Sequence, residues 1–197
     1  MNARKSVTTG QIALGVDPGR TGAAVLVRLR ESAPHEAIAA WTWAPSKAKG
    51  GGYNLRTDSG ERVRVESLHE AGAIIAATTR SLAPDGCPVA LEGLYVAPKS
   101  RVPAAAILTL GEAAGEVVGP LRGIMRGSLM RPLYTQWVAR VMPPAHGKPS
   151  RVAKAYILAN TERVVSGLGA VAHVEHCCDA ACIAYLAAVK SWQEVEG

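Results

Sequence analysis

Three acidic residues of this chain stand beside apolar segments that predict buried structure. Asp17 ends the run IALGVD, Glu92 follows the run PVAL, and Asp179 opens the apolar stretch near the end of the chain. A carboxylate is costly to bury unless it is paired or bound to a metal ion, so acids in such places need a chemical reason. We therefore treat the three as candidate catalytic carboxylates, although each taken singly also fits a capped turn or a helix start.

The pattern of apolar residues predicts the elements that position these acids. Ile12–Asp17 and Ala23–Leu29 flank the turn PGRTG and predict a β-hairpin with Asp17 at its turn. Further strands are expected at Glu36–Trp43, Pro88–Leu91 and Pro132–Val138. Helical spacing predicts helices at Glu66–Leu82, Pro103–Val118, Ser150–Val165 (capped by Ser150) and Cys178–Val189. Strands followed by alternating helices and strands indicate an α/β fold, a mixed β-sheet flanked by α-helices.

The domain organisation expected from length and composition is simple. The 197 residues match one domain, and the middle of the chain contains no long polar linker. We expect a single domain over residues 1–197 with a flexible N-terminus at 1–10. Residues 46–62, rich in Gly and charge, predict a mobile excursion from that domain.

The chemistry predicted for the acids depends on their meeting at one edge of the sheet. They converge if the first strand lies beside the strand that ends at Glu92, and if the last helix packs its N-terminus on the same edge. Oxygen ligands of this kind suit Mg²⁺, for which Mn²⁺ can substitute. Two such ions about 4 Å apart activate a water and stabilise the leaving oxygen of a phosphodiester. The acids therefore predict a metal-dependent nuclease.

The charge of the chain suggests a polyanionic partner. The formal net charge is +6 and the pI is about 9.4. Between Leu121 and Val165 there are eight basic residues and one acid, a local charge of +7. We interpret this region as a DNA-binding surface; a solvated basic face is the alternative.

Four sequence blocks, in order, resemble a known nuclease family. The segments LGVDPGRTGAAVL, VALEGLYV, ILTLGEAAGEVVG and HCCDAACIAYLAA are similar to the blocks of the RuvC-type Holliday-junction resolvases, and they cover about Ile12 to Val189. The resemblance implies an RNase H-like fold and a homodimeric, Mg²⁺-dependent endodeoxyribonuclease that cuts four-way DNA junctions. The Gly-rich segment at 46–62, and Gly93 directly after the strand acid, depart from the family pattern.

Carried over position by position, the resemblance implies roles for individual residues. It assigns catalysis and metal binding to Asp17, Glu92, Asp179 and His176, which stands three residues before Asp179. His176 is either a metal ligand or a proton carrier. Tyr95 matches the aromatic that stacks into the opened junction. The remaining residues expected to bind DNA are Lys99, Arg101, Lys148, Arg151 and Lys154.

Four alternatives stay open at this point. Two of them are a nuclease of the same superfamily that acts on other branched DNA, and a protein that binds junctions without cutting them. The segment DPGRTGAAVL also resembles the phosphate hairpin of actin-like ATPases and sugar kinases, which need a second such domain. A zinc module is the last alternative, with its ligands drawn from His173, His176, Cys177, Cys178 and Cys182.

The compartment expected from the sequence is the cytoplasm of a bacterium or of a host cell. Three of the four cysteines crowd into Cys177–Cys182, which favours buried thiols over a disulfide framework. We see no apolar stretch near the roughly 20 residues that span a bilayer, and no apolar segment of a secretory signal in the opening MNARKSVTTG. No membrane partner is expected.

Overall fold

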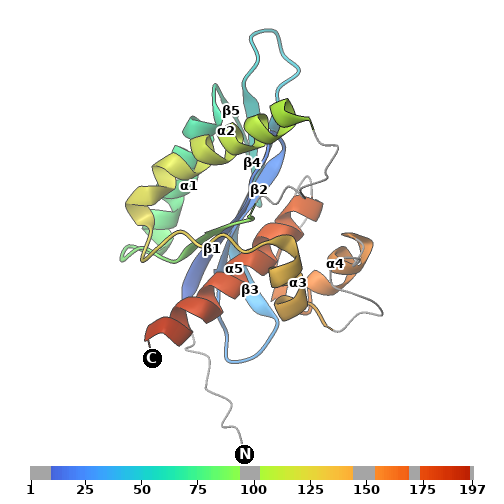
Figure 1. Ribbon diagram of the computed structural model, residues 1–197. Helices are drawn as coiled ribbons and strands as arrows, with labels where there is room; N and C mark the ends of the chain where they lie inside the picture. The colour runs from blue at the N-terminus through green and yellow to red at the C-terminus, as the bar shows by residue number, and fades with distance from the viewer. Residues whose placement is uncertain (1–9, 94–102, 144–153, 169–173, 196–197) are drawn as a thin grey trace, which may run out of the picture.

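The computed structural model describes residues 10–93, 103–143, 154–168 and 174–195, with the side chains of the last range given to Val189 (Figure 1). Its strands are β1 (Ile12–Asp17), β2 (Gly22–Arg28), β3 (His35–Pro45), β4 (Tyr53–Thr57), β5 (Arg62–Val65), β6 (Val89–Leu91) and β7 (Val165–Ser166). Its helices are α1 (Leu68–Leu82), α2 (Ala104–Leu121), the short 3₁₀ helix η1 (Arg122–Ile124), α3 (Tyr134–Val141), α4 (Lys154–Thr161) and α5 (Val174–Val195).

The strands form one mixed sheet in the order β5-β4-β3-β2-β1-β6, and β7 pairs with β3. β1 runs antiparallel to β2 and parallel to β6. Because β1 and β6 run in the same direction, their carboxyl ends meet at one edge of the sheet. Beyond β6, the chain from Met125 to Leu133 adds three isolated parallel bridges. The predicted α/β fold, a mixed sheet flanked by helices, is confirmed.

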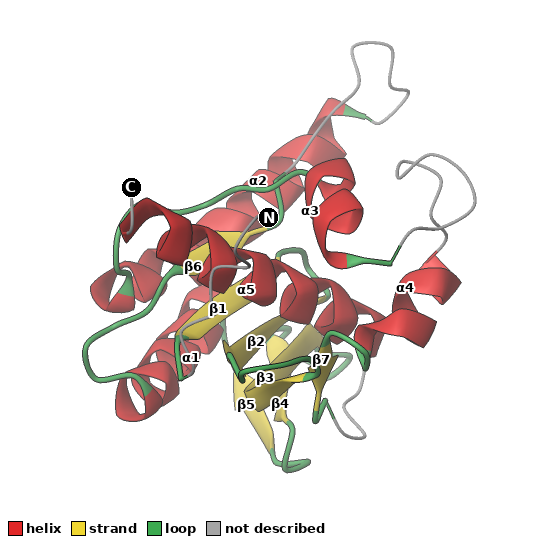
Figure 2. Ribbon diagram, turned by 90° about the horizontal axis from the view of Figure 1, so that it is seen from below, coloured by secondary structure: helices red, strands yellow, loops and turns green. Residues whose placement is uncertain are grey.

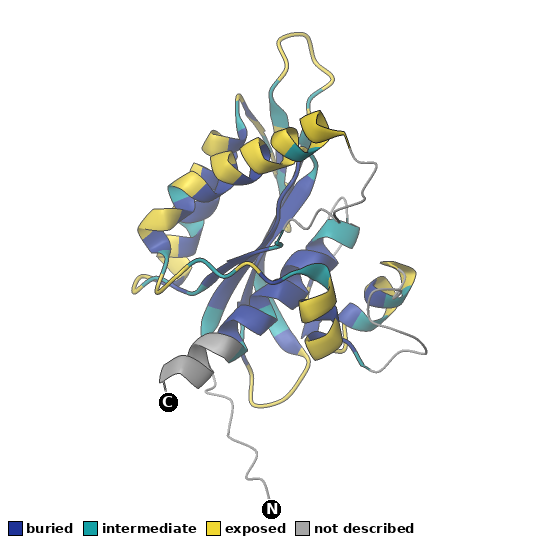
Figure 3. Ribbon diagram, in the orientation of Figure 1, coloured by how far each residue is buried: buried dark blue, intermediate teal, exposed yellow. Residues whose placement is uncertain are grey.

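Helices cover the two faces of the sheet with two separate layers (Figures 1 and 2). α1 and α2 pack on one face, over a core that contains Trp41, Trp43 and Leu55. α5 crosses the other face, with α3 and α4 packed beside it. Figure 3 shows the central strands of the sheet buried between these layers, whereas β5 and the outer turns of α2 carry exposed residues.

Small residues let α5 lie close to β1. The face of α5 that enters the core consists mainly of alanine, with Ala180, Ala184, Ala187 and Ala188 all fully buried. A Cβ placed on Gly15 of β1 would overlap the backbone of Ala180 and of Ala184. Only glycine at this position allows the approach, and it fixes the height of α5 above β1.

The structure corrects several sequence predictions of local structure. Residues 46–62, predicted as an excursion from the domain, contain the strand β4, which pairs with β3 and with β5, the strand that begins at Arg62. The predicted strand Pro132–Val138 is mostly the helix α3, which the Gln136 side chain caps by accepting a hydrogen bond from the Leu133 N–H at 3.0 Å. The predicted helix Ser150–Val165 is described only as α4, its Ser150 cap lies outside the described residues, and Val165 begins β7.

Helix α2 differs from expectation in two ways. With η1 it spans Ala104–Ile124, 21 residues, and its length and composition do reach those of a membrane-spanning segment. The sequence prediction that no such stretch exists is wrong on those two measures. The C-terminal half of α2 nevertheless packs into the core, because Ala114 and Val117 are buried there. The sequence alone offers the apolar face of residues 103–118, with Leu110, Ala114 and Val117, as a candidate contact of the expected homodimer. The burial of Ala114 and Val117 within the chain removes these two residues from that contact.

Candidate active site

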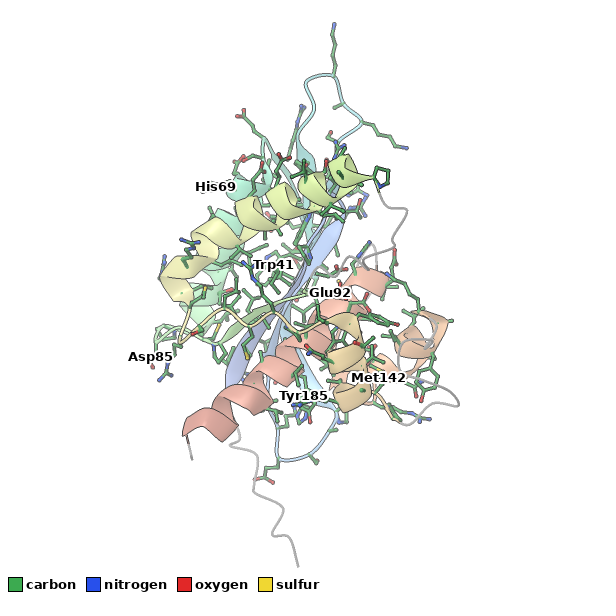
Figure 4. All side chains as sticks on the ribbon, viewed as in Figure 1. Trp41, His69, Asp85, Glu92, Met142 and Tyr185 are labelled. Carbon is green, nitrogen blue, oxygen red and sulfur yellow. The ribbon has the colours of Figure 1, made fainter. Side chains whose placement is uncertain are left out.

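Three elements bring the predicted acids to one edge of the sheet. Asp17 is the last residue of β1, Glu92 follows the last residue of β6, and Asp179 lies in the second turn of α5. The helix begins at Val174 and not at Cys178 as predicted, so Asp179 lies within it instead of at its start. Asp17 is 7% exposed and Asp179 only 4%, so this edge of the sheet buries two carboxylates. Figure 4 shows Glu92 between the sheet and α3.

The side chain of Glu92 is held by α3. Its Oε1 accepts a hydrogen bond from the Trp137 indole N–H at 3.3 Å, and Trp137 is fully buried. Burial, followed by the nearby charges of Asp17 and Asp179, raises the pKa of Glu92 to about 7, while the Trp137 bond opposes that rise. Desolvation and like charge both disfavour the ionised carboxylate.

Asp17 is paired with His176. The His176 Nδ1 lies 2.5 Å from the Asp17 Oδ2, which joins the end of β1 to the first turns of α5. The hydrogen bond to Asp17 raises the pKa of His176, although partial burial acts in the opposite direction. Because its pKa is raised, the His176 imidazole stays protonated up to a higher pH than a solvated imidazole does.

Asp179 faces a lysine from α4. The Lys154 Nζ lies 3.5 Å from the Asp179 Oδ2, and the lysine side chain remains 60% exposed. Burial and the charge of Asp17 raise the pKa of Asp179 to about 6, and Lys154 partly offsets this. Lys154 was predicted to bind DNA, and the structure brings it to the acids themselves.

The site therefore combines three acids with two basic side chains. Each buried carboxylate raises the energy of the others, which is the electrostatic condition under which a divalent cation binds favourably. The donor set, carboxylate oxygens with one imidazole, suits Mg²⁺ or Mn²⁺. Within the described ranges, however, no three His, Cys, Asp or Glu side chains are already arranged to hold one metal ion. The contacts from His176 and Lys154 occupy carboxylate oxygens that a metal ion would use.

Most of the predicted DNA-binding residues fall outside the described ranges. Tyr95, Lys99, Arg101, Lys148 and Arg151 all lie there. Lys154 is the member of that set that the structure describes. The DNA-binding assignments of the other five residues therefore stay predictions.

The zinc alternative gains no support from the described residues. Cys177, Cys178 and Cys182 are buried free thiols on the face of α5 that enters the core. Burial raises the pKa of all three, which disfavours the thiolate that zinc requires. His173 lies outside the described residues.

The largest pocket described lies away from the acids. It is lined by residues such as Gln11, Ala83 and Arg126, near the amino end of β1, and contains none of the candidate catalytic residues. The acids stand at the opposite end of β1.

Comparisons with known proteins identify the fold. No protein-family model matches the sequence, and a search of curated proteins finds no match either. Among solved structures, the chain is similar to RuvC of T. thermophilus in complex with a Holliday junction substrate. That similarity has a TM-score of 0.51 and 17% sequence identity, and it covers 93% of this chain and 96% of that chain. The chain therefore has the RNase H-like fold that its sequence predicts.

A second structure of Thermus thermophilus RuvC is also similar, at 18% identity and a TM-score of 0.45. It covers 93% of this chain and 97% of that chain. At such identities the likeness concerns the fold, and the activity of this chain has to be argued from its own residues.

Sequence reasoning missed one residue of the site and gave another a narrower role. Trp137 was assigned to a strand, yet it lies on α3 and donates to Glu92. Lys154 was predicted only as a DNA contact, yet it also faces Asp179. A buried indole N–H needs an acceptor, so the single Trp of α3 is a signal that could have pointed to Glu92.

Proposed function

We propose that this chain is a divalent-metal-dependent endonuclease that cuts four-way DNA junctions as a homodimer. The observation that carries the proposal is the convergence of Asp17, Glu92 and Asp179, from β1, β6 and α5, on one buried edge of an RNase H-like sheet. The similar T. thermophilus RuvC structure holds a Holliday junction substrate, which supports branched DNA as the substrate class.

In this proposal Asp17, Glu92 and Asp179 hold Mg²⁺, with His176 as a further ligand or as a proton carrier. When bound, the ions supply Lewis-acid activation of the attacking water and of the leaving oxygen. His176 already shares a proton with Asp17, so it can move a proton at the end of β1. Lys154, exposed on the solvent side of Asp179, holds the phosphate beside the acids.

The homodimer follows from the substrate. Two opposed strands of a junction must be cut at positions related by a two-fold axis, and a closed dimer supplies two sites with that relation. The first turns of α2 are the surface that supports such a contact, because Leu108 is 66% exposed and Leu110 is 37% exposed. We assign the dimer contact to these turns, in place of the buried Ala114 and Val117.

The test uses a labelled four-way junction beside a linear duplex, each with Mg²⁺ and with EDTA. We expect the purified protein to cut the junction, with paired cuts, only when Mg²⁺ is present. Asp17→Asn, Glu92→Gln and Asp179→Asn should each abolish cutting and leave junction binding largely intact, because each removes an acid and no cationic phosphate contact. The exposed Glu31→Gln, in the connection between β2 and β3, is the matched control and should cut normally.

Outcomes against the proposal are equally specific. Near-normal Mg²⁺-dependent cutting by one of the three acid variants would remove that residue from the site. Equal cutting of duplex and junction would leave a nuclease but not a resolvase. A protein that sediments as a monomer and still makes paired cuts would exclude the dimer.

A further inference from the structure

The hairpin β4–β5 has one apolar and one basic face. Leu55 of β4 and Val65 of β5 are buried in the core under α1 and α2. Because side chains alternate along a strand, Arg56, Arg62 and Arg64 face the other side of the sheet, the side on which α5 lies. Arg62 and Arg64 are exposed, and Arg56 is half-buried.

The strand register connects these arginines to the acid cluster. Cross-strand partners across β1, β2, β3, β4 and β5 form one row whose members are Asp17, Ala23, Thr42, Arg56 and Arg62. Partners directly opposite one another point to the same face of a sheet. Neighbouring strands are about 4.8 Å apart, so Arg56 lies about 14 Å and Arg62 about 19 Å from Asp17 along the row.

Arg56 and Arg62 are directly opposite each other on neighbouring strands. Like charges in that position destabilise a sheet, by about 0.2–1 kcal/mol for such pairs. Within the described part of the chain, neither guanidinium forms an ion pair that would relieve the repulsion. Two adjacent cations of this kind form a site for a bridging anion.

Two acids, Asp58 and Glu61, lie in the turn between β4 and β5, next to the row. The charge of Asp58 raises the pKa of Cys177 on α5, so Asp58 lies on the α5 side of the sheet. Its Oδ1 accepts a hydrogen bond from the Ser59 N–H at 2.9 Å, and within the described residues neither acid forms an ion pair with Arg56 or Arg62. Arg64, two residues beyond Arg62, donates to the Gly51 carbonyl at 3.2 Å and holds the loop before β4.

We propose that Arg56 and Arg62 bind the phosphate backbone of a duplex DNA arm as it leaves the acid cluster. This inference rests on the proposed nuclease function and adds an arm-binding surface to it. Duplex DNA carries one phosphate per 3.4 Å of axis on each strand, so the row reaches phosphates about four to six base steps from the cut. The hairpin, the segment that departs from the family pattern in the sequence, supplies this surface.

The experiment compares Arg56→Gln/Arg62→Gln with the matched control Arg30→Gln/Arg80→Gln. The control removes the same charge from two exposed positions, Arg30 after β2 and Arg80 in the last turn of α1, both outside the basic stretch 121–165. Binding of a four-way junction is measured between 50 and 200 mM salt. Each phosphate contact contributes about 0.9 to the salt slope, so over that range the wild type should lose about tenfold more affinity than the arginine variant. The control should keep the wild-type slope.

Two further readouts identify the contact. Neutral methylphosphonate linkages three to seven nucleotides from the cut should weaken binding by the wild type and by the control variant, and should leave the arginine variant unchanged. The melting temperature of the DNA-free arginine variant should equal or exceed that of the wild type, because like-charge repulsion is relieved. A lower melting temperature with an unchanged salt slope would show that the arginines only protect the sheet edge, and would overturn the inference.

The two proposals fail in different ways. If the arginine variant keeps the wild-type slope while the wild type cuts junctions, the arm-binding surface is excluded and the nuclease stands. If the wild type neither binds nor cuts branched DNA, the nuclease itself is excluded.

Discussion

The two faces of the sheet are packed in opposite ways. The face under α1 and α2 is filled by large side chains, with Trp41 (Figure 4) and Trp43 buried. On the other face, the contact between α5 and β1 is made by alanines of α5 and by Gly15, so the helix backbone comes close to β1. The candidate active-site acids belong to the second face.

This difference shows how the fold separates stability from chemistry. A carboxylate on α5 can meet a carboxylate on β1 only if no large side chain separates the two elements. The layer with the tryptophans needs no such closeness, and its buried polar contact is that from the Trp43 N–H to the Gly19 carbonyl at 2.8 Å. Comparing a substitution on one face of the sheet with a similar substitution on the other face therefore tests which face carries the function.

The largest effect is expected from Gly15→Ala, compared with Gly72→Ala in the other layer. A Cβ at either position would overlap backbone, that of α5 for Gly15 and that of Val117 for Gly72. Each variant should lose about 3 kcal/mol of unfolding free energy, the upper end for overpacking, because backbone cannot move aside as a side chain can. Urea unfolding measures both losses.

Only Gly15→Ala should also disable the site, since lifting α5 from β1 separates Asp179 and His176 from Asp17. Cleavage per folded molecule should fall at least about tenfold for Gly15→Ala and stay near normal for Gly72→Ala. Equal cleavage by the two variants would show that the spacing of α5 does not control the acids.

The second effect concerns the buried acids in metal-free protein. The pKa of Glu92 is about 7 and that of Asp179 about 6, against 4.5 and 3.8 for the unperturbed groups. Between these values the folded state binds more protons than the unfolded state, so unfolding free energy falls as pH rises from about 4 to about 7. The raised pKa of His176 acts in the same direction, because its stabilisation is lost above that pKa.

Glu92→Gln removes the largest of these contributions. In EDTA at pH 8 it should be more stable than the wild type, by on the order of 2 kcal/mol, and the difference should vanish near pH 4. Urea unfolding at the two pH values measures it, with exposed Glu112→Gln as the control that stays unchanged. Adding Mg²⁺ should stabilise the wild type more than Glu92→Gln. A variant less stable than the wild type at pH 8 would contradict the repulsion between the acids.

The sequence predicted the acids and the order of elements well, for a physical reason. Asp17 and Glu92 stand at the ends of short apolar runs. The parallel pairing of β1 with β6 brings the carboxyl ends of these two strands together, whatever else surrounds them. The hairpin β4–β5 was missed because its strands are short and carry several charged residues, and because three consecutive glycines, Gly50–Gly52, precede it. Trp137 was missed because Pro132 and the β-forming residues after it favour a strand locally, while packing against α5 selects the helix.

A third, smaller effect is expected from Trp137→Phe, compared with Trp43→Phe. Each change removes one indole N–H, from Glu92 in the first case and from the Gly19 carbonyl in the second. Each should cost about 1–2 kcal/mol of unfolding free energy, from the lost hydrogen bond and the smaller ring. Because the bond from Trp137 lowers the pKa of Glu92, its loss should raise that pKa further. The acid limb of the cleavage profile should then move to higher pH for Trp137→Phe and not for Trp43→Phe; equal shifts would contradict a specific contact.

The smallest effect on stability is expected from Lys154→Gln, at the solvent side of the acid face. The lysine is 60% exposed, and exposed ion pairs contribute about 0.2–1 kcal/mol, so the unfolding free energy should change by less than about 0.5 kcal/mol. The pKa of Asp179 should rise in the variant, because the Lys154 cation lowers that pKa in the wild type.

If Lys154 also holds a phosphate, the salt slope of junction binding should flatten by about one unit in Lys154→Gln. Lys154→Arg should restore the slope, since the charge returns. A loss above about 2 kcal/mol with an unchanged slope would instead make Lys154 a structural anchor of α4 on α5. The position of Asp179 would then depend on the packing of α4 against α5.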